Sequence, residues 1–489
     1  MAPRKLTDYE RKRLENIRRN DEVMASLKLH SKATQLSNFK RPRVEQTKSH
    51  NVKPKIQTPI VIRRSLRTRV IPPHSTTPSK TEPSSSGPLS MSDARHGTHS
   101  HSSFIQSLMC MAKKQAQTVR DKVGRFLNDV SVKEEKMETS LRLKSLHLDP
   151  ENIARVVPGR ITDVRFFPST SVKMIAAGNR FGHIGFWNVG QREVHLYHPH
   201  LAQISGILIQ PHCFSKGAFE VKGEAKEESK LCFTAAESHI SYEFRSSSVN
   251  IYTSCYDGTV RLMDAEKEIF DLVVDSDECI FALSQPTNEA NCLYFAEGYG
   301  GLTIWDNRIG KRSSHWVLHK RRINTVDFNC ENPHIVATSC SDGTACTWDL
   351  RYTDGDKLTP LRIFTHDRAL QSAYFSPSGS SLAITSMDTT IGIYSGVNLE
   401  DATLIYHNNQ NSTRLSTFRA KWGWDDSYLF IGNTKRGVDV VSAVERRRVM
   451  TLESPYLSAF PCRLDTHSYE VGMLVGATNG GQVYTWTSR

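Results

Sequence analysis

The residues of this chain that are best suited to chemistry are cationic side chains standing close together. Lys320, Arg321 and Arg322 are consecutive and directly precede an apolar run, and two further basic clusters occupy 40–43 and 63–69. Adjacent Lys and Arg side chains neutralise phosphates and release counterions, which gives salt-sensitive binding with little sequence preference. The alternative for the three consecutive cations is an exposed charged turn, because charge runs are usually solvated.

No motif predicts catalysis or a resident metal. The ten Cys residues include no Cys-x-x-Cys pair, and we find no metal-ligand spacing, Gly-rich phosphate loop or nucleophile elbow. Two sets of residues predict buried hydrogen-bonded networks, which specify β cores, rather than active sites: His319 with Asp342, Trp348 and a hydroxyl from Thr338 or Ser339, and His366 with Asp388. We therefore expect no enzyme, no cofactor and no metal site.

These residues lie within a repeat. The sequence Trp-Asp-Asn-Arg at 305–308 recurs as Trp-Asp-Leu-Arg at 348–351, 43 residues later, and each copy closes an alternating apolar and polar stretch. A period of 40–45 residues ending in Trp-Asp is typical of one four-stranded blade of a β-propeller. Seven positions match once any large apolar residue is allowed: Trp187, Met263, Trp305, Trp348, Tyr394, Val440 and Trp486. The sequence thus predicts an all-β, seven-bladed WD40 propeller over 151–489.

Local sequence supports the blades. Asp257-Gly258 and Asp342-Gly343 lie between apolar runs and predict type I′ hairpin turns. The second blade is longer than the others, and its excess is expected in loops at 216–230 and 241–250.

The last blade lacks room for its outer strand, since only three residues follow Trp486. The run 153–157 is apolar and β-prone, and we expect it to supply that strand from the other end of the domain. Such closure protects the edge of the sheet.

The basic excess is confined to the leader. Residues 1–150 hold 30 Lys+Arg against 14 Asp+Glu, whereas 151–489 hold 33 against 37. This asymmetry is typical of a polyanion-binding arm on a near-neutral domain, and a solubilising tail is the alternative. Basic clusters also serve as nuclear-import signals. The start lacks the apolar core of a signal peptide and no apolar run reaches membrane-spanning length, so we expect a nuclear protein.

Two helices are expected in the leader. A short basic helix near 8–28 lies in an arm, 1–103, that is otherwise rich in Pro, Ser and Thr and predicted to be mostly disordered. From Ile105 to Phe126, apolar residues at intervals of three and four predict an amphipathic helix within a linker, 104–150. The same spacing suits packing on the propeller or docking of a partner, and both remain open.

Several of these segments also carry a family resemblance. Four segments resemble the changed-mutation-rate family of WD-repeat proteins, which is described as DNA damage-binding. They are LTDYERKRLENIRRN, RRSLRTR, FFPSTSVKMIAAGNRFGHIGFWNV and CSDGTACTWDLR. This resemblance covers nearly the whole chain and is weakest over 71–150. More distantly, HKRRINTVDFN through WDLR, and the segment THDRALQSAYFSPSGSSLAITS, resemble the small subunit of the UV-damaged-DNA-binding protein. The second resemblance implies a propeller that presses one face on duplex DNA and holds a cullin-RING ligase adaptor with the other.

For the DNA side, the resemblance implies contacts by loops around one mouth of the channel. Arg165 and Arg419 are expected in equivalent places near the start of their inner strands, pointing to this mouth. The loop 407–414 takes the place of a wedge hairpin but has no aromatic residue, so contacts to the DNA backbone are expected rather than base displacement. The implied DNA-binding residues are Arg165, Arg180, Lys320, Arg321, Arg322, Arg368, His407, Asn408, Asn409, Gln410, Arg414 and Arg419.

For the adaptor side, the resemblance implies that the two Trp-Asp-x-Arg motifs bind the adaptor. Asp306, Arg308, Asp349 and Arg351 match the motif by which many propellers engage the adaptor. The alternative is an Asp–Arg ion pair within each blade, which is common at surfaces and individually weak.

We therefore expect a non-enzymatic DNA- or chromatin-binding protein of the DNA damage response. A substrate receptor of a cullin-RING ubiquitin ligase is the second hypothesis. A scaffold for histones or chaperones is the third, although the cations at 320–322 would repel a basic peptide at the channel mouth.

Overall fold

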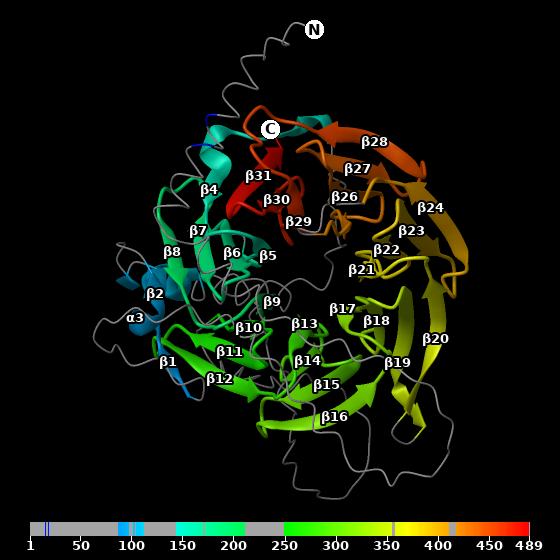
Figure 1. Cartoon of the computed structure of the whole chain (residues 1–489), viewed down its shortest axis with the longest axis horizontal. Coiled ribbons are helices and arrows are strands. Elements are labelled where there is room, and N and C mark those ends of the chain that lie inside the picture. Colours follow the sequence, from blue (N-terminus) through cyan, green and yellow to red (C-terminus); the bar gives the residue numbers. More distant parts are fainter. Residues whose placement is uncertain are drawn as a thin grey trace, which may run out of the picture. The chain divides into compact units, whose positions relative to one another are not determined.

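Seven antiparallel sheets surround a central axis in the computed structural model (Figure 1). The structure describes residues 87–96, 101–102, 104–111, 143–169, 172–210, 249–354, 357–409 and 417–488, together with Glu15 and Arg18. The chain divides into two units, 1–80 and 81–489, and the fold below is that of the second. Glu15 and Arg18 are helical, and the rest of the helix predicted at 8–28 lies outside the described residues.

Each sheet is one blade, and in blades 1 to 6 four strands run from the channel outward in chain order. In blade 1 these are β5 (Ile161–Phe166), β6 (Met174–Asn179), β7 (Ile184–Asn188) and β8 (Val194–Tyr197). In blade 2 they are β9 (Ile204–Ile209), β10 (Ile251–Cys255), β11 (Thr259–Asp264) and β12 (Ile269–Asp275). In blade 3 they are β13 (Ile280–Ser284), β14 (Cys292–Glu297), β15 (Gly301–Asp306) and β16 (Lys311–Val317).

The remaining blades follow the same plan. Blade 4 contains β17 (Ile323–Phe328), β18 (Ile335–Cys340), β19 (Thr344–Asp354) and β20 (Lys357–Thr365). Blade 5 contains β21 (Leu370–Phe375), β22 (Leu382–Ser386), β23 (Thr390–Ser395) and β24 (Asp401–Tyr406). Blade 6 contains β25 (Lys421–Trp422), β26 (Tyr428–Gly432), β27 (Val438–Ser442) and β28 (Arg447–Leu452), and blade 7 contains β29 (Pro461–Thr466), β30 (Leu474–Thr478) and β31 (Gln482–Ser488). The prediction of a seven-bladed propeller is confirmed.

Ring closure follows the predicted route. The outer strand of blade 7 is β4 (Ile153–Arg155), which pairs antiparallel with β31 and so joins the two ends of the domain. A second short strand, β3 (Leu146–His147), pairs with Thr487 and Ser488 at the far end of β31. The backbone amides of Val156 and Val157 both approach the Gly481 carbonyl as the chain turns into blade 1.

The repeating apolar position falls on the third strand of every blade, with one correction. In blades 1 to 5 and 7 the predicted residue pairs with the second strand and stands five residues after the last residue of the hairpin loop, as Trp486, which pairs with Leu474, does after Gly481. In blade 6 this place belongs to Val441, which pairs with Leu429, so Val440 is one residue early. Both valines are buried, which is why the apolar pattern did not separate them.

The Asp-Gly hairpins occur where predicted, but the turn type was wrong. A type I′ turn needs positive φ at both central residues, whereas only the glycines have it, at +90° for Gly258 and +93° for Gly343. The loops have three residues and a left-handed glycine in last place, and the Asp carboxylate accepts the amide of the following Thr instead. A Cβ at Gly343 would lie 2.7 Å from the His366 carbonyl oxygen, so the close approach of the next loop also requires glycine.

Part of the leader packs on the propeller. β1 (Leu89–Ser90) pairs with β12, and β2 (Arg95–His96) pairs with β8, on either side of the four-residue helix α3 (Met91–Ala94). These strands add a fifth member to blades 2 and 1. Neither was predicted, because a two-residue strand has no periodicity to detect.

The amphipathic helix is described over 104–111. Its Phe104 is 1% exposed and stacks on Phe186 and His195, at ring centroid distances of 4.9 and 4.7 Å. Ile105, Leu108 and Met111 are buried in the same cluster. Of the two roles expected for this helix, packing on the propeller or docking of a partner, the described half has the first. The rest of the predicted helix, 112–126, lies outside the described residues, and no described helix is long and apolar enough to cross a membrane.

Candidate nucleic-acid interface

One face of the propeller collects the predicted DNA-binding loops. Because the strands of a blade are antiparallel, the loop that enters the inner strand and the hairpin between the second and third strands lie at the same edge. Backbone hydrogen bonds join these pieces between neighbouring blades, as from Leu318 N to Gly300 O (2.8 Å), and within a blade, as from Ser341 N to Arg322 O (3.1 Å). We call this side the entry face, and the side with the other connections the opposite face.

The basic loop 320–322 is exposed on the entry face and its backbone is fixed. All three side chains are exposed. The Arg321 carbonyl accepts the Cys340 thiol at 3.2 Å, the Arg322 carbonyl accepts Ser341 N, and the Arg322 guanidinium lies 5.5 Å from the Phe281 ring centroid. The loop therefore presents three cations from a backbone held in place on both sides.

Further cations share this face. Arg180 is exposed in the β6–β7 hairpin, 4.8 Å from the Phe181 ring centroid, and Arg368 is exposed in the loop before β21. Lys435 and Arg436, in the β26–β27 hairpin, are also exposed and were not predicted. Aligning the hairpins of all seven blades would have found them. Acidic residues interrupt the cations, mainly near blades 2 and 3: Asp277, Glu278, Asp367 and Glu453.

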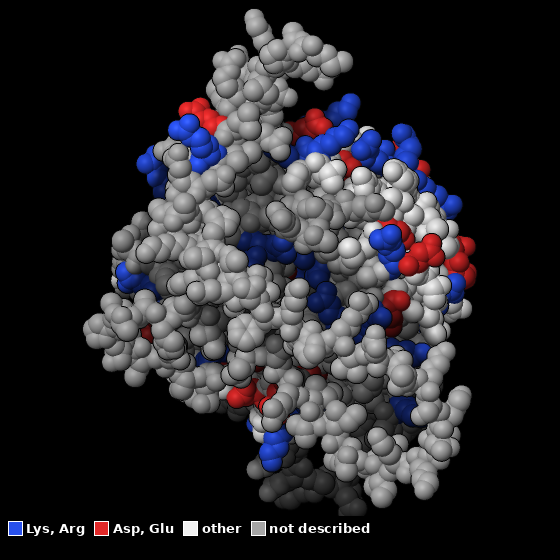
Figure 2. Space-filling view, viewed as in Figure 1, with Lys and Arg blue, Asp and Glu red and all other residues white. Residues whose placement is uncertain are grey.

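Lys and Arg side chains also line the central hollow (Figure 2). The cavity there has a volume of about 660 Å³ and is bordered by the inner strands and by loops of the opposite face. Arg165 is the fifth of six residues of β5, so it lies toward the end of that strand and away from the entry face. Its guanidinium pairs with Asp163 (3.5 Å) and Asp465 (3.9 Å), and Asp163 in particular raises its pKa against the opposing effect of burial. The prediction that Arg165 points to the DNA-side mouth is wrong.

Arg165 and Arg419 are also not equivalent. Arg165 pairs with Ala176, three residues before Asn179 of its hairpin, and Lys421 pairs with Phe430, three residues before the equivalent Asn433. Arg165 is therefore level with Lys421, two residues beyond Arg419. Most inner strands contain a bulge after their first residue, which shifts any register counted from sequence alone. Arg419 is half-buried near the entry-face end, where Nη2 donates to the Asn324 carbonyl at 3.2 Å.

The predicted buried network around His319 is present and includes one more residue. His319 Nε2 lies 2.8 Å from Thr338 Oγ1, which also accepts Trp348 Nε1 at 2.8 Å. On the other side, Nδ1 lies 3.1 Å from Thr344 Oγ1, whose hydroxyl donates to Asp342 Oδ1 at 2.6 Å. His319 and Asp342 are 4.0 Å apart, so Thr344 is the link that sequence reasoning missed. Burial lowers the pKa of His319 to about 4, against the attraction of Asp342.

The same arrangement corrects two predicted DNA contacts. His366 lies 3.6 Å from Asp388, as expected, and His407 takes the equivalent place in blade 6, 3.2 Å from Asp439. His407 is 5% exposed and Asn409 is 4% exposed, with Asn409 Oδ1 2.7 Å from His407 Nδ1. Both side chains are thus core residues and do not reach a ligand on the surface. Asn408 is exposed, and Gln410 and Arg414 lie outside the described residues.

The Trp-Asp-x-Arg motifs form ion pairs on the opposite face. Arg308 donates to both oxygens of Asp306 at 3.1 and 2.6 Å, and Arg351 does the same with Asp349 at 3.0 and 2.7 Å. Hydrogen bonds from Arg308 lower the pKa of Asp306 to about 2. The Arg side chains remain 66% and 55% exposed. The internal pairing predicted as the alternative is therefore present, and it leaves both guanidinium groups accessible.

Comparison with known proteins agrees with this architecture. The WD domain, G-beta repeat family model matches residues 310–349, which run from the end of blade 3 into blade 4. The chain contains a WD40 repeat. WD repeat-containing protein 76 of Xenopus laevis is 24% identical over 98% of this chain and 80% of its own length.

Proteins named DNA damage-binding protein CMR1 are similarly related. The protein of Vanderwaltozyma polyspora is 23% identical over 99% of this chain and 98% of its own length, and that of Chaetomium globosum is 25% identical over 68% and 65%. The resemblance found in the sequence is confirmed: these proteins are homologues of this chain.

Stability should depend on the neutral state of His319. Between pH 6.5 and 4 the unfolded chain binds a proton at this position that the folded chain does not, so folding loses about 3 kcal/mol from this residue as the pH falls from 7 to 4. His319→Gln should remove that share of the pH dependence in urea unfolding, whereas His334→Gln, at an exposed site, should not. An unaltered pH dependence in His319→Gln would contradict the network.

Proposed function

We propose that this protein binds DNA, free or in chromatin, as a nuclear WD40 protein of the DNA damage response. The observation that carries the proposal is the exposed basic loop 320–322 on a rigid entry face, with Arg180, Arg368 and the pair 435–436 on the same side. The names of the CMR1 homologues point to the same ligand. The role proposed is that of a binding protein rather than an enzyme.

The chemistry of this surface favours contact with phosphates rather than readout of bases. Its groups are Lys and Arg, which position a protein on the DNA backbone and carry no sequence information themselves. The described part of the loop after His407 presents no exposed aromatic or aliphatic wedge, and two of its three side chains are buried. The basic leader would add affinity of the same sequence-independent kind.

Charge reversal on the entry face tests the proposal. Lys320→Glu, Arg321→Glu and Arg322→Glu together, in the full chain, should weaken binding to duplex DNA at least tenfold. The slope of log affinity against log salt should become shallower by about 0.9 for each phosphate that the variant no longer neutralises. Both follow from fluorescence anisotropy measured over a series of salt concentrations.

The matched control reverses three exposed cations on the opposite side: Arg192→Glu, Lys311→Glu and Arg446→Glu. The net change in charge is the same, so a non-specific electrostatic effect would appear equally in both triple variants. Equal loss in the two would show an effect of net charge alone, and no loss in the first would show that the basic loop does not bind DNA; either result would contradict the proposal.

Docking of a ligase adaptor is a second candidate, supported by the two ion-paired arginines on the opposite face. Each guanidinium is held in a fixed orientation and is more than half exposed, on neighbouring blades. A planar, permanently charged group fixed in this way suits recognition of a protein partner.

Arg308→Ala with Arg351→Ala should abolish capture of a cullin-RING ligase adaptor in a pull-down while leaving DNA affinity unchanged. The triple variant of the basic loop should behave in the opposite way. Full recovery of the adaptor with the double variant would show that these arginines do not bind the adaptor and serve only as ion-pair partners of Asp306 and Asp349.

A further inference from the structure

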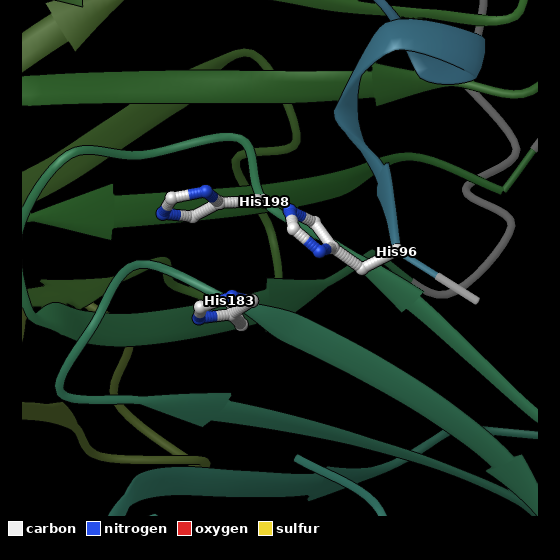
Figure 3. Close-up of side chains that lie close together, drawn as sticks. All are labelled: His96, His183 and His198. Atoms are coloured by element: carbon white, nitrogen blue, oxygen red, sulfur yellow. The ribbon is translucent and has the colours of Figure 1, made fainter. Parts of the chain in front are cut away.

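Three histidines from separate parts of the chain meet at the edge of blade 1. His96 is on β2 of the leader, His183 ends the β6–β7 hairpin, and His198 follows β8. One possible ligand atom from each lies within 4.8 Å of the other two. Figure 3 shows the rings of His183 and His198 one above the other, with the ring of His96 reaching toward them from the side. The ring centroids are 4.2 Å apart for His183 and His198, and 5.3 and 5.6 Å from His96 to each.

The hydrogen bonds around His198 leave one ring nitrogen with a lone pair that can bind a ligand. His198 Nε2 lies 2.9 Å from the Phe181 carbonyl, which can only accept, so Nε2 carries the proton and Nδ1 carries the lone pair. This is the usual second contact of a metal-binding histidine, in which the other ring nitrogen donates to a backbone carbonyl. The backbone is fixed too, because His198 N donates to the Ala94 carbonyl of the leader at 2.7 Å.

The backbone of His183 is anchored as well. Its amide donates to Asn179 Oδ1 at 2.9 Å, whereas the contact of its Nδ1 with Asn179 Nδ2 is long, at 3.4 Å, and that amide already donates to the Pro158 carbonyl at 2.6 Å. The ring is thus weakly held by this neighbour.

The other two clusters of possible metal ligands among the described residues lack free nitrogens. In the set His200, Cys255 and Asp257, both ring nitrogens of His200 face threonine hydroxyls, at 2.9 and 2.8 Å. In the set His319, Cys340 and Asp342, the ring nitrogens again face two threonines. These sets are the structural networks of the blades.

We propose that His96, His183 and His198 bind one divalent transition-metal ion, with zinc the expected ion, and thereby fasten the leader strand β2 to blade 1. Imidazole nitrogen suits zinc, and three ligands leave a position for water or an external group. In a tetrahedral site with Zn–N distances near 2.0–2.1 Å the nitrogens stand about 3.3 Å apart, so the rings must turn and close by roughly 1.5 Å. The ring torsion of histidine is soft enough for this movement. The sequence predicted no metal site because the three ligands come from segments far apart in the chain.

Zinc titration of the full, reduced protein against a chromogenic chelator tests the proposal. The wild-type chain should bind one zinc ion that Mg²⁺ does not displace, and His96→Ala, His183→Ala and His198→Ala should each weaken it at least tenfold. His334→Ala, which removes an exposed histidine on the opposite face, should bind as the wild type does.

Cobalt reports the ligand type. Co²⁺ bound at this site should give visible d–d bands without thiolate charge-transfer absorption, and these bands should vanish in the three variants. Zinc binding that persists in His96→Ala, whose side chain is exposed, would overturn the proposal. So would the absence of a tight zinc ion in the wild-type chain, or a cobalt spectrum with thiolate absorption.

Discussion

Closure of the ring is the constraint on which the rest of the structure depends. The last strand, β31, would be an open edge if the chain ended the propeller by itself, and β4 and β3 cover it from the other end of the domain. Once the ring is closed, every blade has a neighbour on both sides. From the junction of blades 7 and 1 to that of blades 4 and 5, the entry loop is hydrogen-bonded to the hairpins of both blades. These bonds hold the entry face in place, although it consists almost entirely of connections.

Buried histidines also fix the conformation of the loops. Four blades place a His before the inner strand and an Asp in the following hairpin or the strand after it, joined directly or through a threonine hydroxyl. In blade 4 that His is His319, whose neighbour along the chain is Lys320. A surface cation is therefore anchored by a neutral core residue one position away. The equivalent network in blade 6 buries His407 and Asn409, which sequence similarity alone predicted to contact DNA.

The sequence predicted the features that repeat and missed those that depend on register or on distant pairing. The spacing of Trp305 and Trp348 gave seven blades and the closing strand, since each is a local pattern of apolar residues. Arg165 was misplaced because bulges in the inner strands move side chains along the channel, where alternation cannot be counted. Thr344, β2 and the three clustered histidines were out of reach, because their partners are set by how blades and leader meet in space.

The basic residues of the propeller differ in whether an acidic side chain pairs with them. In the channel, Arg165 and Lys421 pair with Asp163 and Asp465, and the arginines of the Trp-Asp-x-Arg motifs pair with their own aspartates, whereas no acidic side chain within salt-bridge distance is found for Lys320, Arg321 or Arg322 among the described residues. The central claim is that this loop, on the entry face, meets DNA. Photo-crosslinking of the full chain to duplex DNA containing iododeoxyuridine, followed by mass spectrometry, tests it most directly. We expect adducts in 318–322 and in the neighbouring entry-face segments 180–183 and 433–437. Adducts confined to the leader, 1–80, or to the opposite face around 306–310 would contradict it.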